Sequence, residues 1–128
     1  MRMFLCISAC IAVMSGFLFA HHGGMAYDRT KLTNLKATIT EFRWSNPHVQ
    51  IFFDAKDEKG NVTHWNCESV NPGMLAKQGW TKRTLKSGDE VTIAAFPSKF
   101  AGKEEFTVCL LQTLTLADGT ILKSQVLD

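Results

Sequence analysis

Apolar and polar residues alternate along much of the chain beyond residue 34, and this two-residue period predicts β-strands. The clearest case is the segment 48–57, in which four apolar residues share one face: Val49, Ile51, Phe53 and Ala55. Four other segments with strand character are 35–44, 62–69, 90–97 and 106–116. Turn-forming stretches separate the strands, and the turn at 117–120 leads into a short tail. The pattern therefore predicts five strands.

The first of these segments changes phase along its length. Leu35, Ala37 and Ile39 fall on one face, whereas Phe42 and Trp44 follow the opposite phase. A strand that switches phase contains a β-bulge or a sharp bend, which is common where a sheet curls into a barrel. The pattern thus favours a barrel.

Only one segment has convincing helical signals, and it lies between the third and fourth strands. Asn71 can cap a helix, Pro72 suits the first helical position, and Gly79 is a typical stop. Three strands, a helix and two further strands is the element order of the five-stranded OB barrel. We therefore predict a mostly β fold, an OB-like barrel with one helix between strands three and four. An antiparallel sandwich with an added helix is the alternative.

The first twenty residues differ from the rest of the chain. Their only charge is on Arg2, and the apolar run that follows ends at the small residue Ala20. This pattern is typical of a cleaved signal peptide, and an uncleaved membrane anchor is the alternative. We predict a signal peptide over residues 1–20, an N-terminal arm over 21–34 and a barrel domain over 35–128. The mature protein is expected in the periplasm, without stable membrane insertion after cleavage.

Size and charge then limit the function. Cleavage removes one basic residue, Arg2, which lowers the formal net charge from +2 to +1 and leaves 108 of the 128 residues. That length suits one small domain. The sequence contains no basic block or stripe, so nucleic acid is not expected as a partner.

Two of the four cysteines remain after cleavage, Cys67 and Cys109. Two cysteines in an exported domain suggest one disulfide, and strands three and five, which carry them, are neighbours in an OB barrel. Loop-closure entropy for the roughly 40 enclosed residues predicts a stabilisation of about 3–4 kcal/mol. The alternative is two buried thiols that pack as small hydrophobic groups.

All four histidines also remain after cleavage. If the cut follows Ala20, His21 becomes the N-terminal residue, and its amine and its ring nitrogen form a bidentate chelate. Either His22 or His48 can supply the second imidazole of a nitrogen-rich site. Such ligation favours Cu(II), which also leads the divalent affinity series. His64 is instead expected to point into water from a half-buried strand.

Catalytic groups are less evident. His64 and Glu68 share a strand face, but four strand residues span about 13 Å, which is too far for an acid–base pair. The sequence contains no Ser-His-Asp order, phosphate loop or Cys-x-x-Cys pair. Most aromatic rings are expected in the core, with Phe52 on the outer face of its strand. An enzyme is therefore the least supported class, although a redox enzyme that uses the same copper site stays open.

Several stretches form a recognisable set: "AHHGG", "EFRWSNPHVQIFFD", "GNVTHWNCE", "LKSGDEV" and "LADGTIL". The most specific are the paired histidines and the Trp-x-Asn-Pro-His motif that ends at His48. Together, over about residues 21–122, they resemble the DUF6152 family of small exported bacterial proteins. The resemblance supports His21, His22 and His48 as the residues of interest, and it implies no reaction.

These observations favour a periplasmic barrel that binds copper, or a similar transition metal, through His21, His22 and His48. Its role would be the carriage, buffering or delivery of metal. The competing hypothesis is a metal-free adaptor whose barrel binds a periplasmic partner protein or a small ligand. The mature N-terminus and the metal content of the protein distinguish these two hypotheses.

Overall fold

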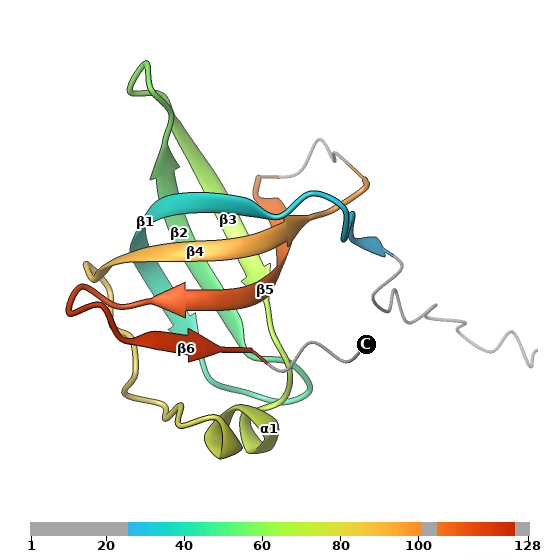
Figure 1. Cartoon of the computed structure of the whole chain (residues 1–128), viewed down its shortest axis with the longest axis vertical. Coiled ribbons are helices and arrows are strands. Elements are labelled where there is room, and N and C mark those ends of the chain that lie inside the picture. Colours follow the sequence, from blue (N-terminus) through green and yellow to red (C-terminus); the bar gives the residue numbers. More distant parts are fainter. Residues whose placement is uncertain (1–25, 101–104, 125–128) are drawn as a thin grey trace, which may run out of the picture.

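The computed structural model describes residues 26–100 and 105–124, which form six strands and one short helix (Figure 1). In chain order these are β1 (Thr33–Arg43), β2 (Gln50–Lys56), β3 (Val62–Glu68), α1 (Pro72–Lys77), β4 (Glu90–Pro97), β5 (Thr107–Thr115) and β6 (Ile121–Lys123). The five predicted strands are confirmed, with bounds that differ by at most two residues. In the described part of the chain, no helix is long and apolar enough to cross a membrane.

The sheet closes on itself to form a barrel. Its strand order is β3-β2-β1-β4-β5-β6, with antiparallel neighbours, and β3 also pairs in parallel with β5. This β3–β5 pairing closes a ring of five strands and confirms the predicted OB-like barrel with its helix between β3 and β4. The sixth strand, β6, extends the sheet beyond β5. The expectation of a tail after residue 120 was wrong, because a three-residue strand is too short to show alternation.

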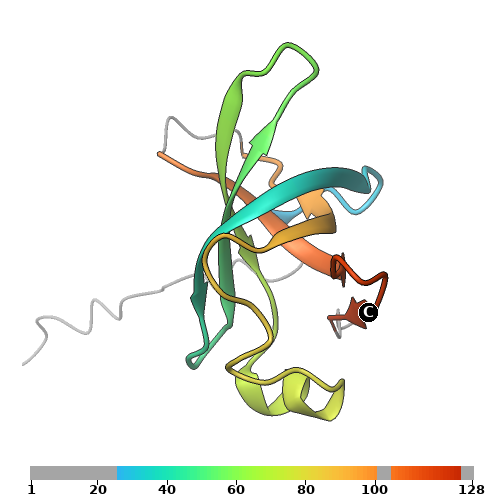
Figure 2. The same cartoon turned by 90° about the vertical axis from the view of Figure 1, so that its left-hand side faces the viewer.

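The bend in β1 is where the sheet curls. The first half of β1 pairs with β4, and the second half pairs with β2. The register with β2 shifts between Ile39 and Glu41, which is the bulge that the phase change predicted. Figure 2 shows the resulting curvature of β1 across the barrel.

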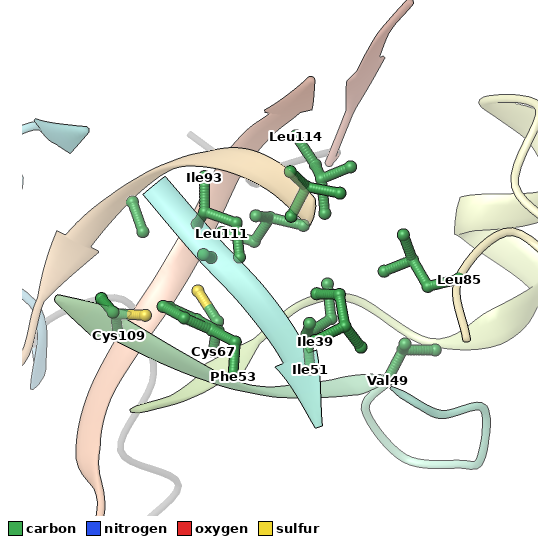
Figure 3. Packing of buried hydrophobic residues seen from close by; sticks show 14 of the residues in the cluster. Ile39, Val49, Ile51, Phe53, Cys67, Leu85, Ile93, Cys109, Leu111 and Leu114 are labelled. Carbon is green, nitrogen blue, oxygen red and sulfur yellow. The ribbon is translucent and has the colours of Figure 1, made fainter. Parts of the chain in front are cut away.

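The inward faces of the strands build one hydrophobic core (Figure 3). Its fully buried members from β1 to β5 include Ile39, Ile51, Phe53, Cys67, Ile93, Cys109, Leu111 and Leu114. The alternation predicted for residues 48–57 is confirmed, since Val49, Ile51 and Phe53 are all 0 % exposed. The barrel is therefore a packed scaffold, and functional groups belong on its outer face or its ends.

The short helix α1 lies at one end of the barrel (Figure 1). As predicted, Asn71 caps it, because the Asn71 side chain accepts a hydrogen bond from the Met74 N–H at 2.9 Å. At the other end Gly79 adopts φ +90°, and the N–H groups of Gly79 and Trp80 bond back to helix carbonyls. This reversal buries Trp80, whose Nε1 donates to the Lys123 carbonyl at 2.9 Å. The helix and the C-terminal strand are thereby joined.

Part of the predicted N-terminal arm packs on the barrel. Tyr27 is only 6 % exposed and forms an isolated antiparallel bridge with Ser98, just beyond β4. The Asp28 N–H also donates to the Pro97 carbonyl at 2.8 Å. Residues 21–25 of the predicted arm lie outside the described residues. In the described part of the arm, Tyr27 is buried although it lies outside the main core cluster. The chain is therefore anchored at residue 27, before β1 begins.

Candidate functional site

His48 lies at the end of the barrel, two residues before β2. Val49 next to it is buried and exchanges two backbone hydrogen bonds with the segment after β3, to Val70 and from Ser69. The His48 Nδ1 lies 3.0 Å from the Ser69 carbonyl oxygen. Because a carbonyl can only accept, Nδ1 carries the proton and donates it, and the neutral ring then has its lone pair on Nε2. Half of the His48 side chain is exposed to solvent.

Glu68, the last residue of β3, places its carboxylate beside that lone pair. Glu68 Oε1 lies 3.7 Å from His48 Nε2, and the side chain is 30 % exposed. Glu68 points to the outer face because its neighbour Cys67 points into the core. The other carboxylate oxygen, Oε2, accepts a hydrogen bond of 2.6 Å from the Tyr27 hydroxyl. His48, Glu68 and Tyr27 therefore form one outer-face cluster, drawn from three distant parts of the sequence.

The Tyr27 hydroxyl holds its proton firmly. Burial raises the pKa of Tyr27, and the hydrogen bond to the Glu68 carboxylate and its negative charge raise this pKa further. The phenol therefore stays neutral at any ordinary pH, and it acts as a hydrogen-bond donor to Glu68. Its effect is to occupy one carboxylate oxygen and leave the other facing His48.

The other predicted ligands, His21 and His22, lie outside the described residues. In residues 26–100 and 105–124, no group of three or more His, Cys, Asp or Glu side chains is arranged to hold a metal ion. His21 precedes the anchored Tyr27 by six residues, and six residues of extended chain span at most about 20 Å. The anchor therefore shortens the tether between the N-terminal histidines and His48, compared with an arm that is free up to residue 34.

His64 occupies a separate place on the outer face. Its Nδ1 lies 2.6 Å from Asp54 Oδ1 on the paired strand β2, and 55 % of its side chain is exposed. This agrees with the expectation that His64 points into water. His64 is four residues from Glu68 along β3, about 13 Å at the usual strand rise. The structure thus places His48 beside Glu68, whereas His64 is not part of the cluster of His48, Glu68 and Tyr27.

The two cysteines lie side by side on β3 and β5, the strands whose pairing closes the barrel. Cys67 and Cys109 are direct partners in the parallel β3–β5 pairing, and both point into the core (Figure 3). Both are present as free thiols, and burial, together with the hydrogen bond to Cys109, raises the pKa of Cys67. The predicted disulfide stays a prediction, although the strand adjacency on which it depended is confirmed.

Phe52 lies on the outer face, as expected, but its ring is covered. The Phe106 ring packs edge-on against it, with 5.3 Å between the ring centroids, and the Arg43 guanidinium carbon lies 4.7 Å from the centroid of the Phe52 ring. Phe52 is 9 % exposed as a result. It is therefore not an open platform for stacking a ligand.

A family model described as a family of unknown function, DUF6152, matches residues 8–106 of the chain. The chain belongs to the DUF6152 family. The match begins within the predicted signal peptide and includes His21, His22, His48 and Glu68, so the whole candidate site falls inside the family region. The match ends before β5, and the stretch "LADGTIL" at residues 116–122, which also carries the resemblance, lies outside it. No curated protein and no solved structure matched the chain significantly.

Proposed function

We propose that this DUF6152 protein is an exported barrel that binds Cu(II), or a similar late transition metal, in its carriage, buffering or delivery. The ligands are the amine and ring of His21, with His22 and His48 supplying further imidazole nitrogens. The barrel serves as a rigid carrier for His48, and the N-terminal residues supply the chelate. Membership in the family assigns no reaction, so the proposal stands on the chemistry of the site.

The observation that carries the proposal is the fixed orientation of the His48 ring. Histidines that bind metals usually donate their second ring N–H to a carbonyl or a carboxylate, which sets the tautomer and the ring angle. His48 makes this contact with the Ser69 carbonyl, and its Nε2 lies 3.7 Å from a carboxylate oxygen of Glu68. His64 is oriented in the same way by Asp54, so what distinguishes His48 is its position beside Glu68 and the anchored Tyr27.

The anchoring of Tyr27 supports the same conclusion. The Tyr27 hydroxyl bonds to the carboxylate that lies next to His48. The chain segment that leads back to His21 and His22 therefore starts at the candidate site, within about 20 Å of chain length. Nitrogen ligands in a tetragonal arrangement suit Cu(II), which binds nitrogen and oxygen sites most tightly of the common divalent metals.

The exported protein should begin at His21, because the apolar run ends at Ala20 and a terminal chelate requires this cut. The intact mass of protein taken from the periplasm is the measurement. A mass equal to that of residues 1–128, or a start after residue 21, would remove the chelate. A start at Ala20 would place His22 third, where backbone amides and the imidazole form a different square-planar site.

Replacing His48 should weaken Cu(II) binding, and replacing His64 should not. We expect the His48→Ala protein to lose about 10–100-fold in affinity, the range seen even when an outer-shell partner of a metal ligand is removed. His64→Ala is a matched control, because His64 is equally exposed and also lies beside a carboxylate on the same sheet. The measurement is titration with Cu(II) against a competing chelator, using protein that starts at His21.

Two results would contradict the proposal. Equal affinities for the His48→Ala and His64→Ala proteins would show that His48 is an ordinary surface histidine. Binding of the unmodified protein that is no tighter than that of an isolated histidine pair would exclude a dedicated site. In the second case the metal-free adaptor becomes the better hypothesis, and the barrel should be tested for a protein partner instead.

A further inference from the structure

We infer that Glu68 is a direct ligand of the bound metal and that Tyr27 is the residue that positions it. This inference rests on the proposed function and adds an oxygen donor to a set that the sequence limits to nitrogen. It assigns roles to two residues that no sequence motif marks as ligands. The site then takes Cu(II) with mixed nitrogen and oxygen ligation.

The distance between the two donor atoms is close to what a shared metal requires. A metal bound at about 2.0–2.2 Å to an imidazole nitrogen and a carboxylate oxygen holds these atoms about 2.9–3.4 Å apart. His48 Nε2 and Glu68 Oε1 are 3.7 Å apart without a metal. A movement of about 0.3–0.8 Å, within reach of two partly exposed side chains, therefore brings both atoms to the separation that a shared metal requires.

The remaining contacts of both side chains leave these two atoms available. The second nitrogen of His48 is used by the Ser69 carbonyl, and the second oxygen of Glu68 is used by the Tyr27 hydroxyl. Each side chain is thus oriented by one hydrogen bond at the atom that does not bind the metal, and outer-shell partners orient metal ligands in this way. The pair His64 and Asp54 lacks this arrangement, since there the ring nitrogen bonds directly to the carboxylate at 2.6 Å.

The oxygen donor also bears on the oxidation state of the metal. Carboxylate oxygen and imidazole or amine nitrogen suit Cu(II), whereas Cu(I) prefers the soft sulfur of thiolates and thioethers. The two cysteines of the barrel point to the inner face of the sheet, away from Glu68 on the outer face. The described donors around His48 therefore suit Cu(II) better than Cu(I).

Tyr27 has a second role, because it belongs to the segment that carries the N-terminal ligands. Its hydroxyl holds Glu68 at 2.6 Å, while its backbone bridges to Ser98. The same residue thus positions the carboxylate and anchors the chain at residue 27. Loss of the hydroxyl should loosen Glu68 without changing which atoms bind the metal.

The Glu68→Gln protein tests the ligand. Glutamine keeps the shape and can still accept the Tyr27 hydrogen bond, but its neutral amide oxygen is a poor metal ligand. We expect the Cu(II) affinity to fall at least about 10-fold and the Cu(II) electron paramagnetic resonance spectrum to change, because one coordinating atom is lost. The matched control is Asp54→Asn, which removes the carboxylate beside His64 and should change neither the affinity nor the spectrum.

The Tyr27→Phe protein tests the positioning role. We expect a weaker affinity, by about 10-fold, with the spectrum of the unmodified protein, because the ligand atoms are unchanged. Thermal unfolding of the metal-free proteins shows whether each variant folds. If Glu68→Gln does not fold, Glu68→Asp replaces it, because the shorter carboxylate should bind the metal with lower affinity.

The outcomes separate this inference from the proposed function. If the unmodified protein does not bind Cu(II), the proposed function fails. If it binds and the folded Glu68→Gln protein shows the same affinity and the same spectrum, the proposed function stands and the role of Glu68 is overturned. A changed spectrum in Tyr27→Phe would overturn the assignment of Tyr27 as a positioning residue only.

Discussion

Oxidation of Cys67 and Cys109 to a disulfide should raise the free energy of unfolding by about 3–4 kcal/mol relative to the dithiol protein. For a domain of this size we expect the melting temperature to rise by about 10–25 °C. The effect arises mainly in the unfolded chain, because the crosslink would enclose roughly 40 residues and restrict their freedom.

The position of the two cysteines makes this bond geometrically reasonable. Neighbouring strands lie about 4.7–4.9 Å apart, within the range of Cα separations of about 4.4–6.8 Å that disulfides occupy. Cys67 and Cys109 are direct partners on adjacent strands, and their side chains are 0 % and 1 % exposed respectively. Such burial shields the thiols in the folded protein, so oxidation has to take place while the chain folds.

The measurement compares one chain in two redox states. Protein is refolded from denaturant with either oxidised glutathione, which takes up the two electrons as it is cleaved to two thiols, or excess reductant. Thiol titration after denaturation should find no free thiol in the first sample, and thermal unfolding should show the stabilisation. The double variant Cys67→Ala, Cys109→Ala is the control, because its melting temperature should be the same in both conditions. Free thiols in the sample refolded with oxidised glutathione would contradict the prediction.

Most of the barrel could be predicted from the sequence because its signals are local. The alternation of residues 48–57, the phase change in residues 35–44 and the helix signals at Asn71 and Gly79 each act over a few residues. The sequence missed β6 for the opposite reason. Residues 121–123 become a strand only because they pair with Thr113–Thr115 of β5, and a strand of three residues carries no period of its own.

The candidate site was only partly predictable because long-range contacts assemble it. His48 stands out in the sequence as a histidine after a turn, but Glu68 pairs in the sequence pattern only with His64, four residues earlier on the same strand. The contact between His48 and Glu68 depends on the pairing of β2 with β3. This pairing sets Gln50 opposite Glu68 and so brings the carboxylate to the end of the barrel where His48 lies. Tyr27 gave no signal at all, since its contact with Glu68 joins residues 41 positions apart.

Moving the N-terminal amine away from His21 should have the largest effect on metal binding. We expect an extension of three alanines before His21 to lower the Cu(II) affinity by at least about 100-fold. The amine and the His21 ring no longer form a chelate in that protein, and even the loss of an outer-shell partner costs about 10–100-fold. The barrel, His48 and Glu68 are unchanged, so this variant isolates the contribution of the terminus.

The length of the extension decides whether this test is informative. One added residue places His22 third from the terminus, and two added residues place His21 third. In both cases the new amine, backbone amides and an imidazole can form a strong square-planar Cu(II) site of another kind. Three added residues avoid both arrangements.

Competition titration should be run on the protein that starts at His21, on the extended protein and on His64→Ala, which should retain full affinity. An extended protein that binds Cu(II) as tightly as the one starting at His21 would show that the amine is not a ligand, and the metal would then have to be held by side chains alone.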